Sequence, residues 1–165
     1  MIFRTADVTD VPALAAMRWS FRSEEGEVPI ESHDVFAKRF GDFVSDGLRS
    51  GSWTYWIAET EEHEIVSQMA VCVVPSIPRP SRAADQWGYL TDCYTLPRFR
   101  SEGVGSALLT RVSQWAAARD LEMILVWPSE KAISFYARAG FTRADDIRML
   151  RLRTYDEPEL PRSNA

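Results

Sequence analysis

The chain has 165 residues, of which 45% are apolar and 12% are aromatic. This length fits one domain of ordinary size. The aromatic content excludes a disordered protein, because disordered chains lack the groups that bury apolar surface. The formal net charge is −5, and the chain contains no run of five or more Lys or Arg residues. A general nucleic-acid-binding role is therefore disfavoured, and we expect a single soluble domain.

The sequence shows no targeting, membrane or metal-binding signal. Residues 1–7 lack a basic stretch followed by an apolar segment, and no apolar run approaches about 18 residues. We therefore expect a cytoplasmic protein without a membrane partner. Cys72 and Cys93 do not have metal-ligand spacing, and His33 and His63 are the only histidines. We expect no metal site, and we expect both cysteines to be buried among apolar side chains.

The first half of the chain predicts one strand, two helices and a β-hairpin. Thr9-Asp10 before Pro12 is typical of a helix start, and the two helical segments show apolar residues at spacings of three and four. Gly47 and Gly51 are expected to end the second helix. The two hairpin strands are rich in aromatic and β-branched residues. In chain order, these elements are expected at residues 2–3, 11–21, 36–48, 53–58 and 65–74.

The second half predicts strands that alternate with helices. A proline-rich segment at 75–81 cannot hold a strand, because proline lacks the N–H donor. The apolar run at 123–127 is typical of a strand buried on both faces, and Gly140 is a good residue to end the last helix. We expect these elements at 89–96, 104–116, 123–127, 128–139 and 148–152, followed by a mobile tail at 155–165.

Two glycines, Gly103 and Gly105, lie where a predicted strand passes into a helix. Such a junction presents unpaired backbone N–H groups at the positive end of the helix dipole, so it favours an anion such as a phosphate. A single Gly-x-Gly is also common in tight turns. The dinucleotide motif needs a third glycine where Leu108 stands, and the Gly-Lys-Ser/Thr of a P-loop is absent. Both common nucleotide motifs are therefore excluded.

Two longer patterns point to one family. After Pro97 the chain follows the pattern Gln/Arg-x-x-Gly-x-Gly/Ala, filled by Arg100, Ser101, Glu102, Gly103, Val104 and Gly105. This segment resembles the coenzyme A loop of the GNAT superfamily of N-acetyltransferases. About thirty residues later, the segment SEKAISFYARAGF at 129–141 is similar to the family's N-x-x-A-x-x-F-Y-x-x-x-G-F. Two matches at the family's separation are much more specific than either one.

The resemblance implies an α/β protein with the GNAT fold. In this fold a central mixed, mostly antiparallel β-sheet is flanked by helices, in the order β-α-α-β-β-β-α-β-α-β. It implies a single acyltransferase domain at 1–154, with the tail at 155–165 outside it. The closely matching patterns lie within 93–141, and the first half of the chain matches through the order of its elements alone.

The resemblance also implies which residues bind acetyl-CoA. Main-chain N–H groups at 101–106 would hold the pyrophosphate. The main chain of Cys93, Tyr94 and Thr95 would pair with the pantetheine arm, where the strand at 89–96 splays from the strand at 123–127. Glu102 departs from the family's usual residue, as do Ser101 and Ser129, and we expect its side chain to be solvated. The expected cofactor-binding residues are Cys93, Tyr94, Thr95, Arg100, Ser101, Glu102, Gly103, Val104, Gly105, Ser106, Ser129 and Tyr136.

Two catalytic residues are expected. By resemblance, the Tyr136 hydroxyl lies beside the cofactor's sulfur and acts as the acid for the leaving thiolate. Asp92 is the first candidate for a general base. The acidic residues at 24–31 and the loop at 75–86 are expected to wall the acceptor's entrance. Trp53, like the other strand tryptophans, is assigned no binding role, because large aromatic residues on strands belong to the core more often than to a ligand site.

The sequence therefore predicts an N-acetyltransferase that moves an acetyl group from acetyl-CoA directly to an amine, on a small molecule or a protein, within a ternary complex. The resemblance also allows a homodimer. Two alternatives stay open. A non-catalytic acyl-CoA sensor or scaffold would use the same loop but would not need Tyr136. An acyltransferase fed by a carrier protein would not need the glycine loop, because the carrier's arm lacks adenosine diphosphate.

Overall fold

The computed structural model describes residues 1–81, 85–150 and 152. These residues form a five-stranded sheet with the order β1-β2-β3-β4-β5. Neighbouring strands are antiparallel except β4 and β5, which are parallel. This confirms the predicted fold class, a mixed and mostly antiparallel sheet flanked by helices. The strands are β1 (Ile2–Thr5), β2 (Trp53–Glu59), β3 (Ile65–Pro75), β4 (Gln86–Thr95) and β5 (Ile124–Val126).

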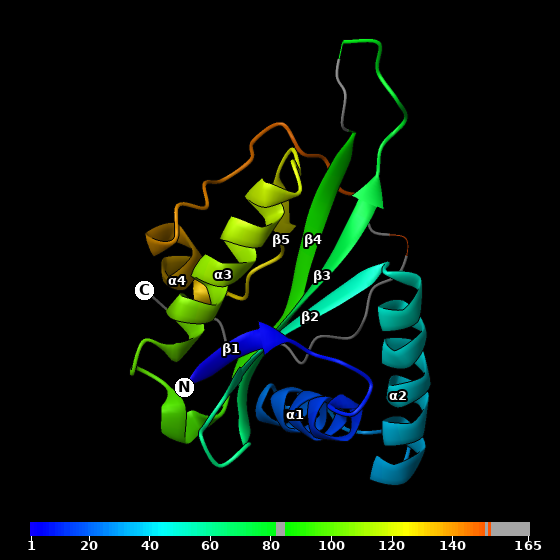
Figure 1. The fold of residues 1–165 in the computed structure, drawn as a ribbon, viewed down its shortest axis with the longest axis vertical. Helices are drawn as coiled ribbons and strands as arrows, with labels where there is room; N and C mark the ends of the chain where they lie inside the picture. The colour runs from blue at the N-terminus through cyan, green and yellow to red at the C-terminus, as the bar shows by residue number, and fades with distance from the viewer. Residues whose placement is uncertain (82–84, 151, 153–165) are drawn as a thin grey trace, which may run out of the picture.

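Two pairs of helices cover opposite faces of the sheet (Figure 1). One pair, α1 and α2, packs on one face, and the other pair, α3 and α4, packs on the other. The chain follows the predicted order of elements through α4. The helices are α1 (Val11–Glu24), α2 (His33–Ser50), α3 (Val104–Ala118) and α4 (Ile133–Arg138), with the short 3-10 helices η1 (Pro97–Phe99) and η2 (Glu130–Ala132) before α3 and α4.

The helix α2 ends at Gly51, as predicted, but Gly47 lies inside it. Ser32 caps the first turn by accepting a hydrogen bond from the Val35 N–H. Gly51 has a φ of 71°, a left-handed conformation that glycine adopts without strain. At Gly47 a Cβ would lie 2.9 Å from side-chain atoms of Trp53. Gly47 is therefore explained by the close packing of α2 on β2 and not by the end of the helix.

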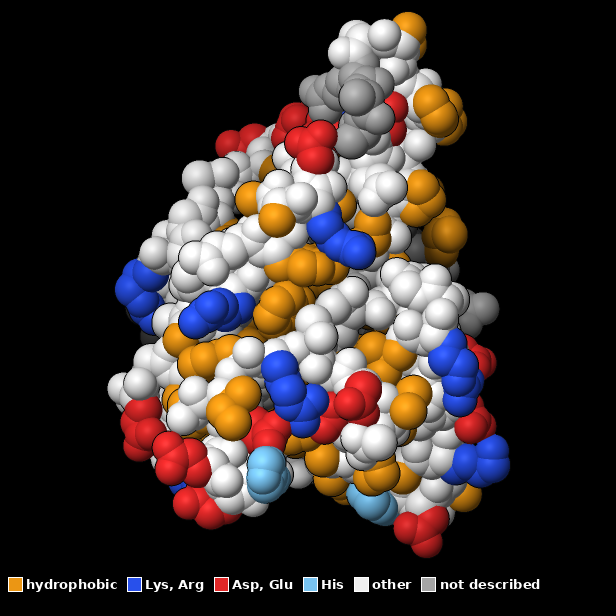
Figure 2. Space-filling model, in the orientation of Figure 1, with side chains coloured by type: hydrophobic (Ala, Val, Ile, Leu, Met, Phe, Trp, Pro, Cys, Tyr) orange, Lys and Arg blue, Asp and Glu red, His pale blue; other side chains and the backbone are white. Residues whose placement is uncertain are grey.

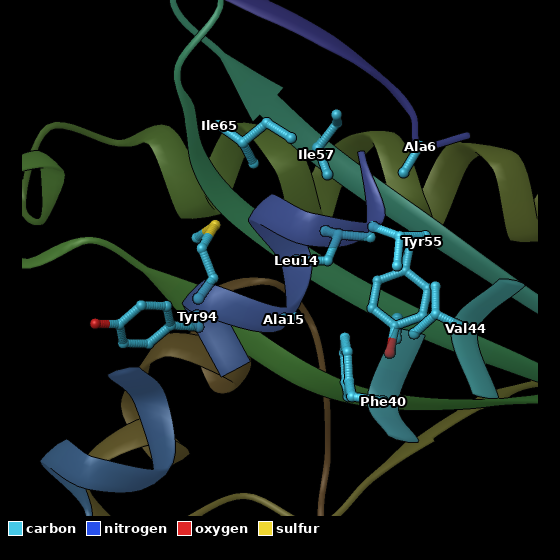
Figure 3. Close-up of a cluster of buried hydrophobic side chains, with 12 residues drawn as sticks. Ala6, Leu14, Ala15, Phe40, Val44, Tyr55, Ile57, Ile65 and Tyr94 are labelled. Atoms are coloured by element: carbon cyan, nitrogen blue, oxygen red, sulfur yellow. The ribbon is translucent and has the colours of Figure 1, made fainter. Parts of the chain in front are cut away.

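Alternate residues of the strands supply two hydrophobic cores, one on each face of the sheet. On the α1/α2 face, Leu14, Val44 and Ile57 are fully buried, and Figure 3 shows their side chains together. On the α3/α4 face, Leu90 of β4 packs with Leu108 of α3. Burial of side chains of this size stabilises the fold by about 1.5–3 kcal/mol each. The two cores fix the helices relative to the centre of the sheet.

The edge of the sheet at β5 differs from the prediction. The strand is short, and its residues are half-buried and not buried on both faces. Met123 and Trp127, which flank it, are 48% and 54% exposed. The last predicted strand, at 148–152, is not formed at 148–150 or at 152, while residue 151 and the tail at 155–165 lie outside the described residues. With no described strand beyond it, β5 is an edge strand, and this explains its exposure.

Charged side chains are mixed over the face shown in Figure 2, where Lys and Arg lie among Asp, Glu and apolar groups. Within the described ranges, no helix combines the length and the apolar character needed to cross a bilayer. The same residues contain no group of three or more His, Cys, Asp or Glu side chains placed to hold a metal ion. Cys72 and Cys93 are free thiols and are half-buried, and Cys93 packs against the apolar core on the α3/α4 face.

Candidate active site

A bulge distorts β4 at the centre of the sheet. The register between β3 and β4 shifts between Gln68 and Ala70, so that Asp92 and Cys93 of β4 both lie opposite Met69. Asp92 has a φ of 52°, a left-handed conformation that is uncommon for a residue with a side chain. As a result, Asp92 lines a cavity on the α1/α2 face, whereas Cys93 packs into the core on the α3/α4 face.

The strands β4 and β5 separate at this bulge. Their parallel pairing runs from Gly88 to Leu90, which lies opposite Val126. Beyond Leu90, no described residue pairs with that edge of β4. The edge of β4 at 91–95 therefore borders a gap between the two strands, similar to the splay that the family resemblance implies.

Cys93 and Thr95 turn their backbone amides toward this gap. The Leu96 N–H donates to the Val66 carbonyl of β3 at 2.9 Å. Because peptide groups alternate in direction along a strand, the Tyr94 N–H also points to β3, while the Cys93 and Thr95 N–H groups point away from it. The three residues predicted to pair with pantetheine thus divide into two that face the gap and one that does not. An extended ligand with amide groups fits such an unpaired strand edge.

The loop between η1 and α3 presents a row of free backbone donors. Within the described residues, no N–H group at 101–106 donates to another protein atom. The Ala107 N–H is the first to be bonded, to the Gly103 carbonyl at 2.9 Å. Glu102 is exposed, as expected for a solvated side chain. The free donors lie at the positive end of α3, so the loop can bind an anion with several oxygens, such as a pyrophosphate.

The two loop glycines are required for different reasons. Gly103 caps α3 with a φ of 82°, and a Cβ there would meet open space, so its conformation demands glycine. At Gly105 a Cβ would lie 3.3 Å from Thr95 Oγ1 and 3.7 Å from the Phe135 ring. Glycine at this second position lets the start of α3 approach β4 and α4 closely. The loop is therefore held directly beside the gap between β4 and β5.

Arg100 ties the loop to the end of α1. Its Nη2 donates to Glu24 at 2.7 Å, and its Nε donates to the Thr95 carbonyl at 2.9 Å. The guanidinium also lies 5.3 Å from the centroid of the Tyr94 ring. The Tyr94 hydroxyl donates to the other carboxylate oxygen of Glu24. Arg100 is thus oriented beside the loop, and Glu24 neutralises part of its charge.

Tyr136, on α4, lies against Cys93 on the α3/α4 face. It is buried, its hydroxyl interacts with the Cys93 thiol, and Phe135 and Phe141 pack edge-on to its ring. Burial, with a smaller contribution from Cys93, raises the pKa of Tyr136 above its ordinary value, and burial raises the pKa of Cys93 to about 12. Both groups are therefore protonated at neutral pH, so Tyr136 has a proton to donate here.

Asp92 is the centre of a buried polar cluster on the opposite face. It is 6% exposed and accepts hydrogen bonds from Arg18 Nη1 at 3.1 Å and from Gln68 Nε2 at 2.8 Å. Burial raises the pKa of Asp92, and contacts with Arg18, Gln68 and Tyr55 oppose this shift. Gln68 Oε1 is also buried, and no described group donates to it. Because of its raised pKa, Asp92 can accept a proton nearer to neutral pH than an exposed carboxylate can.

An open cavity of about 410 Å³ lies in front of Asp92. Its wall includes aromatic rings from α2 and β2, among them Phe40, Phe43 and Trp53, together with the arginine side chains of Arg18 and Arg39. Its volume falls within the range of about 300–1,000 Å³ that is usual for small-molecule sites. The cavity places aromatic, cationic and carboxylate groups around one space. We call it the acceptor-side cavity, because Asp92, the expected general base, lines it.

The predicted entrance walls lie elsewhere. Glu27 and Glu31 line a second, smaller cavity of about 190 Å³, while Glu25 pairs with Arg22. No described residue of the loop at 75–86 lines either cavity. The acceptor-side cavity is instead formed by α1, α2, β2 and β4.

Ser129 lies at the start of η2, on the connection that leads to Tyr136. It is exposed, and its carbonyl accepts the Ala132 N–H at 2.9 Å. Its hydroxyl does not cap the helix, so this side chain is available to a ligand.

Sequence reasoning missed most of the acceptor-side cavity. It gave no binding role to Arg18, Phe40, Phe43 or Gln68, and it assigned none to Trp53. These residues come from four separate elements, so no local pattern joins them. One signal was present, since Phe40 and Phe43 recur at helical spacing on α2, but that spacing describes a core-facing stripe equally well.

A split strand pair beside a row of backbone donors defines a site for an extended ligand that ends in phosphates. The acetyltransferase (GNAT) family profile matches residues 13–141. Because this match covers well over half of the sequence, the chain belongs to the GNAT acetyltransferase family.

Individual relatives agree with this assignment. The glucosamine 6-phosphate N-acetyltransferase of Trypanosoma brucei brucei is 28% identical over 101 residues, which cover 61% of this chain and 66% of that protein. A predicted acetyltransferase from Clostridium acetobutylicum, solved with acetyl-CoA, is 25% identical with a TM-score of 0.77, covering 92% of this chain and 96% of that one. A GCN5-related N-acetyltransferase from Ralstonia eutropha is 23% identical with a TM-score of 0.74, covering 91% and 97%.

Proposed function

We propose that the protein is an N-acetyltransferase that moves the acetyl group of acetyl-CoA directly to an amine within a ternary complex. The observation that carries this proposal is that a row of free backbone donors and an unpaired strand edge both border the gap between β4 and β5. Free N–H donors at 101–106 lie at one end, and the open edge of β4 leads from them to Tyr136. The similar structure solved with acetyl-CoA supports the choice of donor.

The residues at the gap fit acetyl-CoA, which supplies an acetyl group activated as a thioester. The backbone donors at 101–106 hold the pyrophosphate. The main-chain groups of Cys93 and Thr95 pair with the amides of the pantetheine arm. Arg100 adds positive charge beside the loop, and the Ser129 hydroxyl is free for a further contact.

Asp92 and Tyr136 carry out opposite proton transfers from opposite faces of the sheet. The acceptor arrives as an ammonium ion on the Asp92 side, and Asp92 takes its proton so that the nitrogen can form a bond to the acetyl carbon. As the carbon–sulfur bond breaks, Tyr136 gives its proton to the sulfur and the nitrogen loses its second proton to water. Tyr136 and Asp92 then return to their starting states by exchanging protons with water. Burial raises the pKa of both groups, so that Asp92 accepts a proton nearer to neutral pH and Tyr136 still carries one.

The acceptor in this proposal is an amine on a small molecule or a protein. The relative from Trypanosoma brucei brucei is a glucosamine 6-phosphate N-acetyltransferase, so an amino sugar phosphate belongs among the amines to be tested. We also propose that the protein acts in the cytoplasm and uses no metal ion.

Binding of the donor is tested by thermal unfolding with CoA and acetyl-CoA. Both should raise the Tm of the wild type in a concentration-dependent way, because they bind only the folded state. Gly103→Glu brings a negative side chain to the donor loop and should abolish the shift. Gly51→Glu is the matched control, because Gly51 also has a positive φ with open space around its Cβ position. It introduces a similar strain and the same charge at the end of α2, and it should keep the shift.

Transfer is tested by release of free thiol from acetyl-CoA in the presence of a panel of amines. Release with at least one amine, and formation of its N-acetyl product, is the expected result. A CoA shift that survives in Gly103→Glu would contradict the loop assignment. Normal CoA binding without thiol release for every amine would favour the acyl-CoA sensor and contradict the transferase.

A further inference from the structure

The acceptor-side cavity in front of Asp92 has a wall that is apolar and aromatic. Phe43 is 49% exposed at this wall and contacts Trp53 edge-on, with ring centroids 5.5 Å apart. Phe40 lies deeper, 9% exposed, and packs against the Tyr55 ring. A ligand that covers these rings removes apolar surface from water, and flat or branched apolar groups cover them best.

The floor of the same cavity carries opposite charges side by side. Arg18 Nη1 lies 3.1 Å from Asp92 Oδ1. Arg18 uses only this one nitrogen in hydrogen bonds to described residues, and its side chain is 29% exposed. Its remaining donors can therefore receive an anion. The neighbouring Gln68 is fully buried and donates to the other oxygen of Asp92 at 2.8 Å, so Asp92 is the carboxylate that lines the cavity and can receive an ammonium ion.

Two other kinds of amine fit this cavity poorly. A polyamine would bring several positive charges to a wall that has two arginines, Arg18 and Arg39, and one carboxylate, Asp92. An amino sugar would bring several hydroxyl groups, but the uncharged polar side chains of the wall are only those of Thr91 and Tyr55. The Tyr55 hydroxyl already interacts with Asp92. Hydroxyl groups buried without partners would weaken binding.

We propose that the acceptor is a free α-amino acid with a large apolar or aromatic side chain. Its ammonium group lies at Asp92, its carboxylate at Arg18, and its side chain against Phe43 and Trp53. The adjacent positions of Arg18 and Asp92 match the adjacent charges of an α-amino acid. This inference rests on the proposed function, because it names the substrate of the same site.

The test compares phenylalanine with amines that lack one or more of the three features. Phenylalanine carries all three, phenethylamine lacks the carboxylate, alanine lacks the large side chain, and glucosamine 6-phosphate replaces the apolar body with a polyol. We expect kcat/KM for phenylalanine to exceed that of each of the others by about tenfold or more, as the loss of a charge-assisted contact or of a buried ring predicts. An equal or higher value for phenethylamine or for glucosamine 6-phosphate would overturn the proposal.

Two variants assign the contacts, each with a matched control. Arg18→Gln should reduce the preference for phenylalanine over phenethylamine at least fivefold, whereas Arg49→Gln, which removes an exposed arginine of α2, should leave it unchanged. Phe43→Ala should reduce the preference for phenylalanine over alanine, whereas Val35→Ala, which removes an exposed apolar group of the same helix, should not. Preferences that stay the same in both Arg18→Gln and Phe43→Ala would contradict the assignment.

Failure of this inference can be told apart from failure of the proposed function. If no amine releases thiol, titration calorimetry on the CoA-saturated protein still measures binding of phenylalanine and phenethylamine. Binding of phenylalanine at least tenfold more tightly would support the amino-acid site even without transfer. Equal binding, or no binding of phenylalanine, would overturn it. Thiol release with other amines alone would leave the transferase intact and contradict the amino-acid acceptor.

Discussion

In the proposed complex, the two faces of the sheet recognise their ligands by different means. On the α3/α4 face, the proposed contacts to the donor are main-chain groups, at 101–106 and at the open edge of β4. On the α1/α2 face, the contacts to the acceptor are side chains, with Asp92 and Arg18 below a wall of aromatic rings. A site built from main-chain groups restricts which positions must be glycine but otherwise depends little on the side chains. In a site built from side chains, each substitution can change which ligand binds. One face can therefore serve a fixed donor while the other adapts to different acceptors.

The strand β4 joins the two faces at a single bulge. Asp92 and Cys93 are neighbours in sequence, yet one contacts Arg18 on the acceptor side and the other contacts Tyr136 on the donor side. The positive φ of Asp92 is the local strain that makes this possible. Variants on either side of the bulge should therefore separate donor binding, proton transfer and acceptor binding.

The largest effect is expected on the donor face, from Tyr136→Phe. This change removes the hydroxyl but keeps the ring, which packs against Phe135 and Phe141. Turnover should fall by roughly 10²-fold or more, as expected when a positioned acid is lost. Affinity for CoA should stay within a few fold, because the main-chain donors are untouched. Steady-state thiol release and a CoA titration measure the two quantities.

Tyr89→Phe is the control for this variant. Tyr89 also lies on β4, and its hydroxyl makes no hydrogen bond within the described residues, so its loss should change neither quantity. If Tyr136→Phe turns over as fast as wild type, Tyr136 has only a packing role, and water protonates the thiolate.

The two faces also differ in how far the sequence predicts them. The donor loop could be found because Gly103 adopts a positive φ and because a Cβ at Gly105 would lie 3.3 Å from Thr95 Oγ1, so both positions favour very small residues in a short segment. The order of elements through α4 followed from apolar periodicity and turn residues. The acceptor-side cavity could not be found, because Arg18, Trp53 and Asp92 come together only through the pairing of distant strands. Local periodicity also did not show that β5 is short and half-exposed, since that depends on which elements pack beside it.

On the acceptor face, Asp92→Asn should lower turnover by roughly 10- to 10²-fold, and the loss should depend on pH. Burial raises the pKa of Asp92 in the folded protein, so wild-type activity should fall as the pH drops through that raised value. The variant cannot take a proton from the ammonium ion, so only the fraction of amine that is already neutral can react. Its rate should therefore rise as the pH approaches the pKa of the amine. The difference in kcat/KM between wild type and Asp92→Asn should therefore be large at low pH and small at high pH. A pH series of kcat/KM measures it.

Asp46→Asn is the control for Asp92→Asn. It removes an exposed carboxylate of α2 that pairs with Arg49 at 2.8 Å, and it should keep the wild-type profile. Parallel pH profiles for Asp92→Asn and wild type would remove Asp92 from proton transfer.

The smallest effect is expected at the link between the two faces, where Glu24 of α1 binds Arg100 and Tyr94. Both charged partners are partly exposed, at 38% for Glu24 and 45% for Arg100, so Glu24→Gln should change the free energy of unfolding by less than about 1 kcal/mol. The charge of Arg100 beside the donor loop is then no longer opposed, and affinity for CoA should rise by about two- to threefold. Because the effect is electrostatic, it should shrink as salt is raised toward about 1 M.

Calorimetric CoA titrations at low and high salt measure this change in affinity. The exposed pair Asp46–Arg49 again supplies the control. A lower affinity in Glu24→Gln, or a gain that salt does not reduce, would mean that Glu24 acts by positioning Tyr94 and not by screening Arg100.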